Sequence, residues 1–143
     1  MTIACILKHK QSGIVSVSPQ TPIVDVATLL SERHIGAVLV READGALAGI
    51  VSERDIVHGL ARDGAGTLDR TAAHMMTRAV QTATPQTSVE EAMAMMTAGR
   101  FRHLPILDHD RLVGIVSIGD VVKSRLDQQA HEVDSLRAYV AGA

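Results

Sequence analysis

The sequence predicts an α+β fold made of two copies of one unit in tandem. The phrase LAGIVSERDIV at residues 47–57 returns as LVGIVSIGDVV at residues 112–122, with seven of the eleven positions identical. A second pair, SPQTPIVDVA at 18–27 and TPQTSVEEAM at 84–93, is related by an offset of 66. Self-similarity at a fixed spacing indicates a repeated structural unit. Both copies show the same order: a Ser/Thr-Pro turn, a helix, a strand, a turn, a strand and a helix.

The first helix of each copy is predicted from its start signals. Short β-rich segments, SGIVSVS and TRAVQTA, precede the two turns. Pro22 suits the first helical turn after Thr21. Thr87, with Glu90 three residues later, has the spacing of a capping box. Apolar residues then recur at helical spacing in both copies: Val26, Leu29, Leu30, Met93 and Met96.

Two strands and a second helix complete each copy. RHIGAVLV at 33–40 matches RFRHLPIL at 100–107 with an offset of 67, and each contains an apolar run of strand length. The turn signals EADG and DHD follow, and LAGIVS and LVGIVS are the next apolar runs. We expect helices to begin at Glu53 and Ile118. Strands that are apolar along their whole length are typical of sheets covered by helices.

The segment between the copies, DGAGTLDRTAAHMM, is Gly-rich at its start and is interpreted as a linker. HMMT at residues 74–77 is expected to return to a packed position. We therefore place one domain at residues 8–65, a second at 74–128 and a C-terminal helix at 129–143.

The sequence after Val122 predicts an amphipathic helix. Leu126, Val133 and Val140 stand seven residues apart, and Leu136 lies between the last two. Two heptads are too few to establish a coiled coil. We predict that this helix packs on its own domain, and a contact with another subunit is the alternative.

Composition narrows the class of partner. The 14 basic and 16 acidic residues form no run of like charge, which disfavours a nucleic-acid binder that works by phosphate neutralisation. No apolar run reaches the length of a membrane span, and the apolar N-terminal stretch is too short for a secretory signal. A single cysteine, Cys5, fits a reducing compartment. We expect a soluble cytoplasmic protein without nucleic-acid or membrane partners.

The sequence lacks the motifs of metal sites and of common catalytic centres. Its seven histidines have neither the i, i+4 spacing nor the cysteine partners of a zinc site. No nucleophile elbow, P-loop or GxGxxG occurs. We expect no bound metal and no catalytic residues, and we interpret the Lys8–Lys10 segment as a solvated terminus. The methionines outside position 1 are expected in the core: Met75, Met76, Met93, Met95 and Met96.

The second strand of each copy is expected to end at a Ser, and an Asp follows three residues later on the first turn of the next helix: Ser52 with Asp55, and Ser117 with Asp120. Backbone N–H groups at a helix start lack intrahelical partners and attract anions. A carboxylate on the first turn can accept both hydrogen bonds of a ribose 2′,3′-diol. Ser-x-x-Asp is also close to a capping box, a purely structural device. The use of Asp in both copies, where a box prefers Glu or Gln, favours a ligand-binding role.

The repeated motifs resemble those of a tandem pair of CBS domains, the family named after cystathionine β-synthase. The resemblance covers most of the chain and is carried by GIVSERD, GIVSIGD, HIGAVLV, FRHLPIL and HMMT. It implies two βαββα domains packed about a pseudo-two-fold axis, with two clefts between them. Because no enzyme or transporter domain is attached, the chain looks like the stand-alone bacterial CBS-pair proteins.

The resemblance also implies a class of ligand. Such pairs bind adenosine compounds, commonly AMP, ADP or ATP and sometimes S-adenosylmethionine or NAD. By similarity, Asp55 and Asp120 would hold the ribose, and Ser52 and Ser117 would contact ribose or phosphate.

Further phosphate contacts are implied by similarity for Arg102 and His103, the residues before Leu-Pro in the second copy. The first copy has Ile35 and Gly36 at those places. Arg54 is expected to replace the missing cations there, so the two clefts are expected to be unequal.

Three functions remain open at this point. The first is a regulatory module that senses an AMP-like nucleotide, with ATP or NAD as alternatives, and changes its shape or its affinity for a regulated protein. The second is a ligand-independent interaction module with vestigial clefts, in which Ser-x-x-Asp only caps helices. The third, an enzyme that uses NAD, is disfavoured by the missing catalytic set. The resemblance and the apolar C-terminal helix also predict a homodimer.

Overall fold

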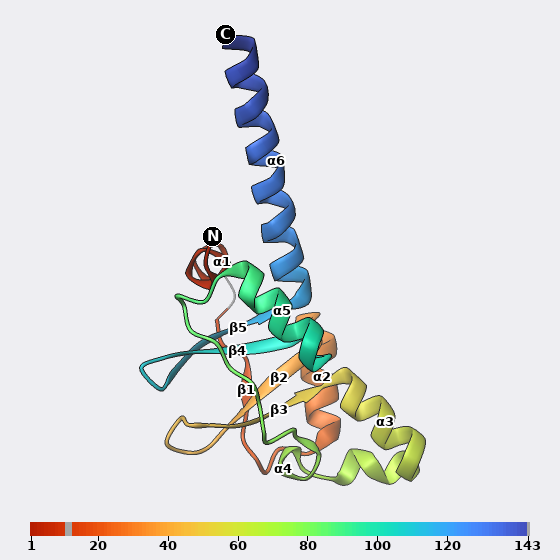
Figure 1. The fold of residues 1–143 in the computed structure, drawn as a ribbon. Coiled ribbons are helices and arrows are strands. Elements are labelled where there is room, and N and C mark those ends of the chain that lie inside the picture. Colours follow the sequence, from red (N-terminus) through yellow and green to blue (C-terminus); the bar gives the residue numbers. More distant parts are fainter. Residues whose placement is uncertain (11–12, 143) are drawn as a thin grey trace. The chain divides into compact units, whose positions relative to one another are not determined.

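The computed structural model describes residues 1–10 and 13–142. The chain divides into two compact units (Figure 1). The first-repeat unit comprises Gly13–Gln81 and Asp110–Leu112, and the second-repeat unit comprises Met1–Ser12, Thr82–His109 and Val113–Ala143. The N-terminal residues therefore pack with the second repeat, although they precede the first repeat in the chain.

The first-repeat unit is a three-stranded sheet with helical segments. Its sheet has the order β1-β2-β3, in which β1 runs parallel to β2 and β2 runs antiparallel to β3. Val40 pairs with Gly49 and Ala37 pairs with Ser52, so the end of β3 lies opposite the start of β2. The elements are β1 (Ser16–Val17), α2 (Ile23–Arg33), β2 (Ala37–Arg41), β3 (Leu47–Ser52), α3 (Glu53–Asp63), the 3₁₀-helix η1 (Gly64–Asp69) and α4 (Ala72–Met75).

The core of this unit follows the predicted periodicities. Helix α2 buries residues three and four apart, and β2 adds alternate residues to the same cluster, as expected for one face of a strand. The segment interpreted as a linker is part of this structure: η1 buries Thr67, whose hydroxyl donates to the carbonyl of Gly59 at 2.9 Å. The buried cluster consists of Ile23, Val26, Leu30, Val38, Val40, Val51, Ile56, Ala72 and Met76.

Within its described residues, the second-repeat unit has a β-hairpin and three helices. Strands β4 and β5 pair, and the two-residue connection between them requires an antiparallel arrangement. The connecting residues, His109 and Asp110, both have positive φ, as in a type I′ turn. The elements are α1 (Ile3–His9), α5 (Val89–Gly99), β4 (His103–Asp108), β5 (Arg111–Ser117) and α6 (Ile118–Gly142). The turn residue Asp110 and the first two residues of β5 group with the first-repeat unit, and the rest of the hairpin belongs to this one.

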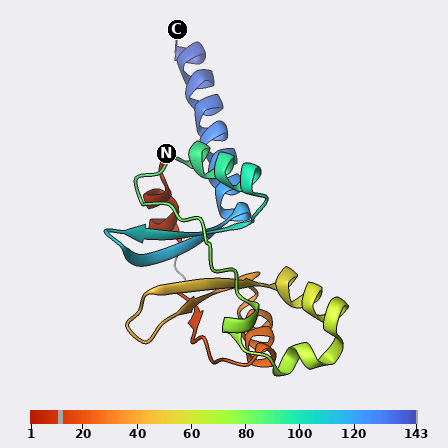
Figure 2. The same cartoon turned by 60° about the horizontal axis from the view of Figure 1, so that its bottom comes forward.

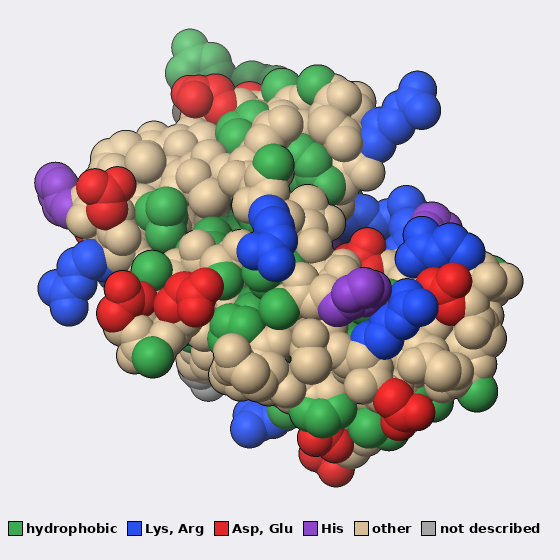
Figure 3. Space-filling view, turned by 90° about the horizontal axis from the view of Figure 1, so that it is seen from below, with side chains coloured by type: hydrophobic (Ala, Val, Ile, Leu, Met, Phe, Trp, Pro, Cys, Tyr) green, Lys and Arg blue, Asp and Glu red, His purple; other side chains and the backbone are tan. Residues whose placement is uncertain are grey.

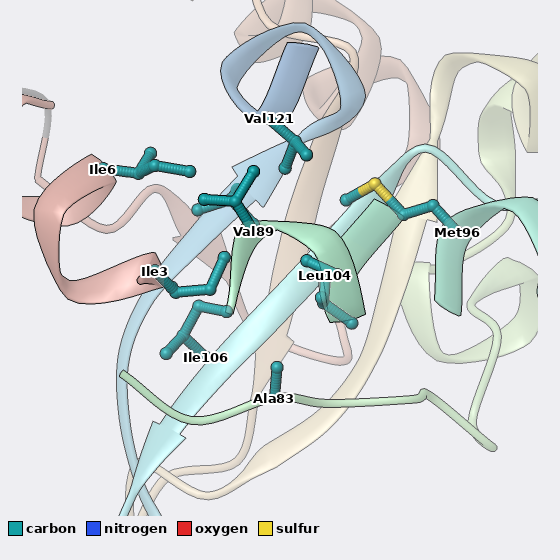
Figure 4. Close-up of a cluster of buried hydrophobic side chains, with 10 residues drawn as sticks. Ile3, Ile6, Ala83, Val89, Met96, Leu104, Ile106 and Val121 are labelled. Atoms are coloured by element: carbon teal, nitrogen blue, oxygen red, sulfur yellow. The ribbon is translucent and has the colours of Figure 1, made fainter. Parts of the chain in front are cut away.

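Helix α1 supplies part of the core of the second-repeat unit (Figure 4). Ile3 is completely buried, and the chain is held there by a hydrogen bond of 2.9 Å from the Ile3 N–H to the Thr87 carbonyl. Figure 2 shows α1 beside the β4–β5 hairpin. The buried cluster consists of Ile3, Ile6, Ala83, Val89, Ala92, Met96, Leu104, Ile106, Val116 and Val121.

Helices α1 and α4 occupy equivalent places in the two units. The Ala72 N–H donates to the Thr21 carbonyl at 2.8 Å, which repeats the bond from Ile3 to Thr87. Thr21 and Thr87 are the residues that the repeat relates by an offset of 66. Helix α1 precedes the first repeat in the sequence but completes the second. Helix α4 precedes the second repeat but completes the first.

The predicted helix starts at Glu53 and Ile118 are confirmed, but those of the first helix in each repeat are wrong by one residue. Pro22 is the N-cap of α2 and has an extended backbone, with ψ of 146°, so helical geometry begins only at Ile23. Ser88 is the N-cap of α5, and its hydroxyl accepts a hydrogen bond of 3.0 Å from the N–H of Glu91. Glu91 therefore takes the third helical position that we assigned to Glu90.

Two further predictions differ from the structure. Within the described residues the segment 77–83 forms no strand, and Ala83 makes only an isolated parallel bridge to Ile106. The predicted C-terminal helix is the outer part of α6, a continuous helix whose start is anchored in the core by Val121. Its residues from 129 to 142 are all exposed, so this part does not pack on its own domain. Figure 1 shows α6 projecting beyond the hairpin of its own unit. The mixed α+β class and the two related domains are confirmed.

Candidate functional site

In the first-repeat unit, the strand-to-helix corner between β3 and α3 contains Ser52 and Asp55. The Ser52 hydroxyl accepts a hydrogen bond of 3.2 Å from the Asp55 N–H, and Asp55 Oδ2 accepts one of 2.8 Å from the Ser52 N–H. These two bonds form a complete capping box. The first helical residue, Glu53, also donates its N–H to the Gly36 carbonyl at 2.9 Å, which ties the corner to the start of β2.

The same corner recurs between β5 and α6 in the second-repeat unit. Ser117 accepts a hydrogen bond of 3.1 Å from the Asp120 N–H, and Asp120 Oδ2 accepts one of 2.9 Å from the Ser117 N–H. The Ile118 N–H donates to the Arg102 carbonyl at 2.7 Å. The two corners therefore have the same local geometry. Each also has the same backbone hydrogen bond, from the first residue of the helix to the residue that precedes the neighbouring strand.

Capping uses only one oxygen of each aspartate. In both boxes the bonded atom is Oδ2, and among the described residues Oδ1 of Asp55 and of Asp120 receives no hydrogen bond. Both residues are half-buried on the first turn of a helix, where the helix dipole favours a negative charge. A cap and an open acceptor thus coexist on the same carboxylate, so the structural and the ligand-binding interpretations do not exclude each other.

Asp120 has an additional partner that Asp55 lacks. The Lys10 ammonium donates to Asp120 Oδ2 at 2.8 Å and to the Ile115 carbonyl at 2.9 Å. The Lys10 and Asp120 side chains are each 28% exposed, so the pair is partly shielded from water. Our interpretation of Lys10 as part of a solvated terminus is therefore wrong.

The electrostatics of Asp120 reflect this pairing. Burial on its own raises the pKa of the Asp120 carboxyl. The hydrogen bond from Lys10, the bonds from Ser117 and the positive charge of Lys10 together outweigh it, so the pKa lies below its ordinary value. Asp120 is thus held in its charged form.

The remaining predicted site residues divide between the two corners. Arg102 is exposed and immediately precedes β4, and its carbonyl bond to Ile118 places it at the Ser117–Asp120 corner. His103 is the first residue of β4 and is half-buried. Arg54 is exposed on the first turn of α3, and within the described part of the chain it forms no ion pair.

The structure corrects the register that we used to compare the segment containing β2 with the segment containing β4. Gly36 and Arg102 make the same backbone bond to their corners, so they are equivalent with an offset of 66, where the sequence comparison used 67. The residues that stand in place of Arg102 and His103 are therefore Gly36 and Ala37, and Ile35 corresponds to Phe101. The cationic pair is still missing from the first corner, so the predicted inequality is retained.

Sequence reasoning missed the role of Lys10 because we placed this residue in the first domain, at residues 8–65, whereas it packs with the second repeat. A weak signal was present: TIACIL at residues 2–7 resembles TAAHMM at residues 71–76, with Thr and Ala at matching places. These two segments contain the equivalent helices α1 and α4. Comparing them would have indicated that the N-terminus packs against the second repeat.

Other kinds of site find little support in the described residues. No group of three His, Cys, Asp or Glu side chains in residues 1–10 and 13–142 is arranged to hold a metal ion. None of the helices in these ranges combines the length and the apolar character needed to cross a bilayer. Basic and acidic side chains are interspersed on the face shown in Figure 3.

Comparison with known proteins places the repeats in one family. The sequence model of the CBS domain matches residues 10–62 and 72–127. A CBS domain-containing protein of Bacillus subtilis, YhcV, is 32% identical over 120 residues, which are 82% of either chain. The mitochondrial CBS domain-containing protein CBSX3 of Arabidopsis thaliana is 33% identical over 124 residues, which are 84% of this chain. That alignment spans only 60% of the length of CBSX3.

Solved structures agree with this assignment. The CBS-domain protein ATU1752 of Agrobacterium tumefaciens is 40% identical, has a TM-score of 0.85, and the match covers 87% of this chain and 99% of that one. The structure of CBSX2 in complex with AMP is 25% identical with a TM-score of 0.74, covering 90% and 98% of the two chains. The two strand-to-helix corners thus lie within known repeats, and the chain is a member of the CBS domain family with two copies of the domain.

Proposed function

We propose that the chain is a regulatory module that binds an adenine nucleotide of the AMP type at the Ser52–Asp55 and Ser117–Asp120 corners. The observation that carries this proposal is the duplicated carboxylate with one oxygen bonded in a cap and the other oxygen open. Ribose hydroxyls donate hydrogen bonds, and an ionised carboxylate only accepts them. Two acceptors fixed on helix starts are suited to a diol.

The charged residues near each corner support an anionic ligand. Arg102 and His103 are proposed to contact phosphate at the second corner, and Arg54 at the first. Arg is well suited to phosphate because its planar donors match the phosphate oxygens. The structural similarity to CBSX2, which was solved with AMP, favours AMP over ADP, ATP and NAD.

Regulation requires more than binding. A ligand shifts a protein between two states only when its affinity for them differs. The proposal therefore includes a change in shape, or in affinity for a regulated protein, when the nucleotide binds without being chemically converted.

Calorimetric titration with AMP, ATP and NAD tests the proposal. Asp55→Asn and Asp120→Asn are the informative variants, because the remaining amide oxygen can still accept the capping bond while the carboxylate is lost. Each is expected to weaken AMP binding at its own corner without unfolding the protein. AMP binding that survives unchanged in both single variants and in the double variant would contradict the proposal.

The alternative, an interaction module whose Ser-x-x-Asp motifs only cap helices, is favoured by one observation. Both boxes are closed by reciprocal hydrogen bonds in the structure. On this alternative no adenine nucleotide binds, and the Asp→Asn variants affect only stability. A thermal-shift screen separates the two, because a ligand at 100 times its Kd raises stability by about 2.7 kcal/mol.

We also propose a homodimer formed through the exposed part of α6, with a second copy of the chain as the partner. Leu126, Val133 and Val140 occupy one heptad position of this helix and Leu136 the other, and all four are exposed. In a parallel pair, Glu132 of one copy would face Arg137 of the other, an arrangement of opposite charges that flanks many coiled-coil seams.

A further inference from the structure

The two corners differ in the number of acceptor positions that the protein itself uses. Asp55 Oδ2 accepts one hydrogen bond, from the Ser52 N–H. Asp120 Oδ2 accepts two, from the Ser117 N–H at 2.9 Å and from the Lys10 ammonium at 2.8 Å. A carboxylate oxygen has two lone pairs, so Asp120 Oδ2 is saturated and Asp55 Oδ2 retains a free acceptor position.

This difference matters for a vicinal diol. The two hydroxyls of a ribose are best accepted by the two oxygens of one carboxylate, one bond to each oxygen. Asp55 can offer both oxygens without breaking any bond. Asp120 can offer only Oδ1 unless Lys10 moves away.

Lys10 is well anchored, so its release has a cost. Its ammonium also donates to the Ile115 carbonyl at 2.9 Å. Its position is fixed by the preceding helix α1, whose residues Ile3 and Ile6 are buried in the core of the second-repeat unit. Charge-assisted bonds of this kind are stronger than neutral ones, and partial shielding from water limits screening.

We infer that Lys10 is a specificity-determining residue that closes the Asp120 carboxylate to a vicinal diol, so that a ribonucleotide occupies the Asp55 corner first. This inference rests on the proposed function, since it presupposes that the corners bind a nucleotide. It goes further by assigning the two corners different affinities and different sensitivities to the ribose 2′-hydroxyl.

The experiment isolates the Asp120 corner in an Asp55→Asn background. Calorimetry with AMP and with 2′-deoxy-AMP is performed on three proteins: Asp55→Asn alone, Asp55→Asn with Lys10→Met, and Asp55→Asn with Lys10→Arg. The Lys10→Arg substitution keeps the positive charge. Lys8→Met is the matched control, because Lys8 is exposed on α1, two residues before Lys10, and the described structure gives it no ion pair. Urea unfolding of each variant verifies that it is folded.

Lys10→Met is expected to strengthen AMP binding about 1.4- to fivefold, the range set by the strength of a partly exposed ion pair. It is also expected to create a preference for AMP over 2′-deoxy-AMP that the Asp55→Asn protein lacks. Lys10→Arg and Lys8→Met should leave both affinities near those of the Asp55→Asn protein. Weaker or unchanged AMP binding in the Lys10→Met protein overturns the inference, because Lys10 would then assist the ligand or be irrelevant to it.

Failure of the proposed function gives a different result. The Asp120→Asn protein, which retains the Asp55 corner, reports on the proposed function alone. If neither this protein nor the wild type binds AMP, the proposed function fails and the inference fails with it. If AMP binds the Asp120→Asn protein but Lys10→Met has no effect in the Asp55→Asn background, only the inference is lost.

A ligand-free measurement gives a second test. The titration of the Asp120 carboxyl, followed by NMR, should show a lowered pKa in the wild type and a higher pKa after Lys10→Met. Identical titration in the two proteins would show that the ion pair is not formed in solution and would overturn the inference.

Discussion

Leu7 packs directly against Gly114: a Cβ atom on that glycine would come within 2.7 Å of Leu7 Cδ2. At the equivalent place in the first-repeat unit, a Cβ on Gly49 would come within 2.7 Å of both Met76 Sδ and the Thr77 carbonyl oxygen. The two repeats therefore use glycine for the same purpose, which is to admit the short helix that completes each unit.

The two glycines should respond differently to a methyl group. We expect Gly49→Ala to lower the free energy of unfolding by about 1–3 kcal/mol, because a backbone carbonyl blocks the new atom. Gly114→Ala should lower the free energy of unfolding by less, because only the flexible end of the Leu7 side chain has to move. Urea unfolding measures both, with Gly66→Ala as a control at an open position. A larger loss for Gly114→Ala than for Gly49→Ala would contradict this account.

Shortening Ile3 should destabilise the second-repeat unit. Ile3 is fully buried in its core, so Ile3→Ala is expected to cost about 2–5 kcal/mol in the free energy of unfolding. Cys5→Ala, on the exposed side of the same helix, should have little effect. Equal stability of the two variants in urea unfolding would show that α1 does not pack in the core.

Removing a capping hydroxyl should lower the free energy of unfolding by a similar amount at both corners. Ser52→Ala and Ser117→Ala are each expected to lower the free energy of unfolding by about 0.5–2 kcal/mol. Ser88→Ala removes the cap of α5, which lies outside the proposed ligand sites, and serves as the comparison. If Ser52→Ala weakens AMP binding and Ser88→Ala does not, the hydroxyl at the corner also contributes to the ligand site.

The Lys10–Asp120 pair should make stability depend on pH. The pKa of folded Asp120 lies below its ordinary value of 3.8, because burial raises it less than Lys10 and Ser117 lower it. The folded state therefore binds this proton less readily than the unfolded state, and the pair stabilises the protein at pH values above the unfolded pKa. This contribution is lost as the pH falls through the folded pKa.

The corresponding measurement compares wild type with Lys10→Met. The variant should be less stable by about 0.2–1 kcal/mol near pH 7 in urea unfolding. The difference should shrink at a second, acid pH below the pKa of folded Asp120, because the carboxylate is protonated there. A difference that is the same at both pH values would assign the effect of Lys10 to packing.

A charge on the exposed apolar face of α6 should prevent self-association. Leu136→Glu is expected to convert a dimer into a monomer in light scattering coupled to size-exclusion chromatography, because it places like charges at the seam. Ala138→Glu, on the opposite side of the heptad pattern, should remain dimeric. A wild-type protein that is monomeric at all concentrations would refute the proposed dimer.

Much of the fold could be predicted from local sequence patterns. The predicted element order of each repeat was confirmed. It could be predicted because apolar periodicity and turn residues act over a few positions, and because each of these weak signals occurs in both copies. The starts of α2 and α5 were displaced by one residue because the extended backbone at Pro22 and Ser88 depends on the preceding chain, which the pattern does not report. The expected burial of Met76 and Met96 was confirmed.

The candidate site was predictable only in part. Ser52, Asp55, Ser117 and Asp120 were identified because each pair lies within one helical turn. Lys10 was missed because tertiary packing of α1, and no local pattern, brings it to Asp120. Our domain limits of 8–65 and 74–128 and the roles of the corner residues in ligand binding stay predictions.

The placement of α1 has a consequence for protein synthesis. This helix leaves the ribosome well before Leu104, Ile106 and Val116, the residues that bury Ile3 and Ile6. At typical translation rates the delay is on the order of ten seconds. During that interval its apolar face is exposed, and only the emergence of the second hairpin lets the nascent chain cover it.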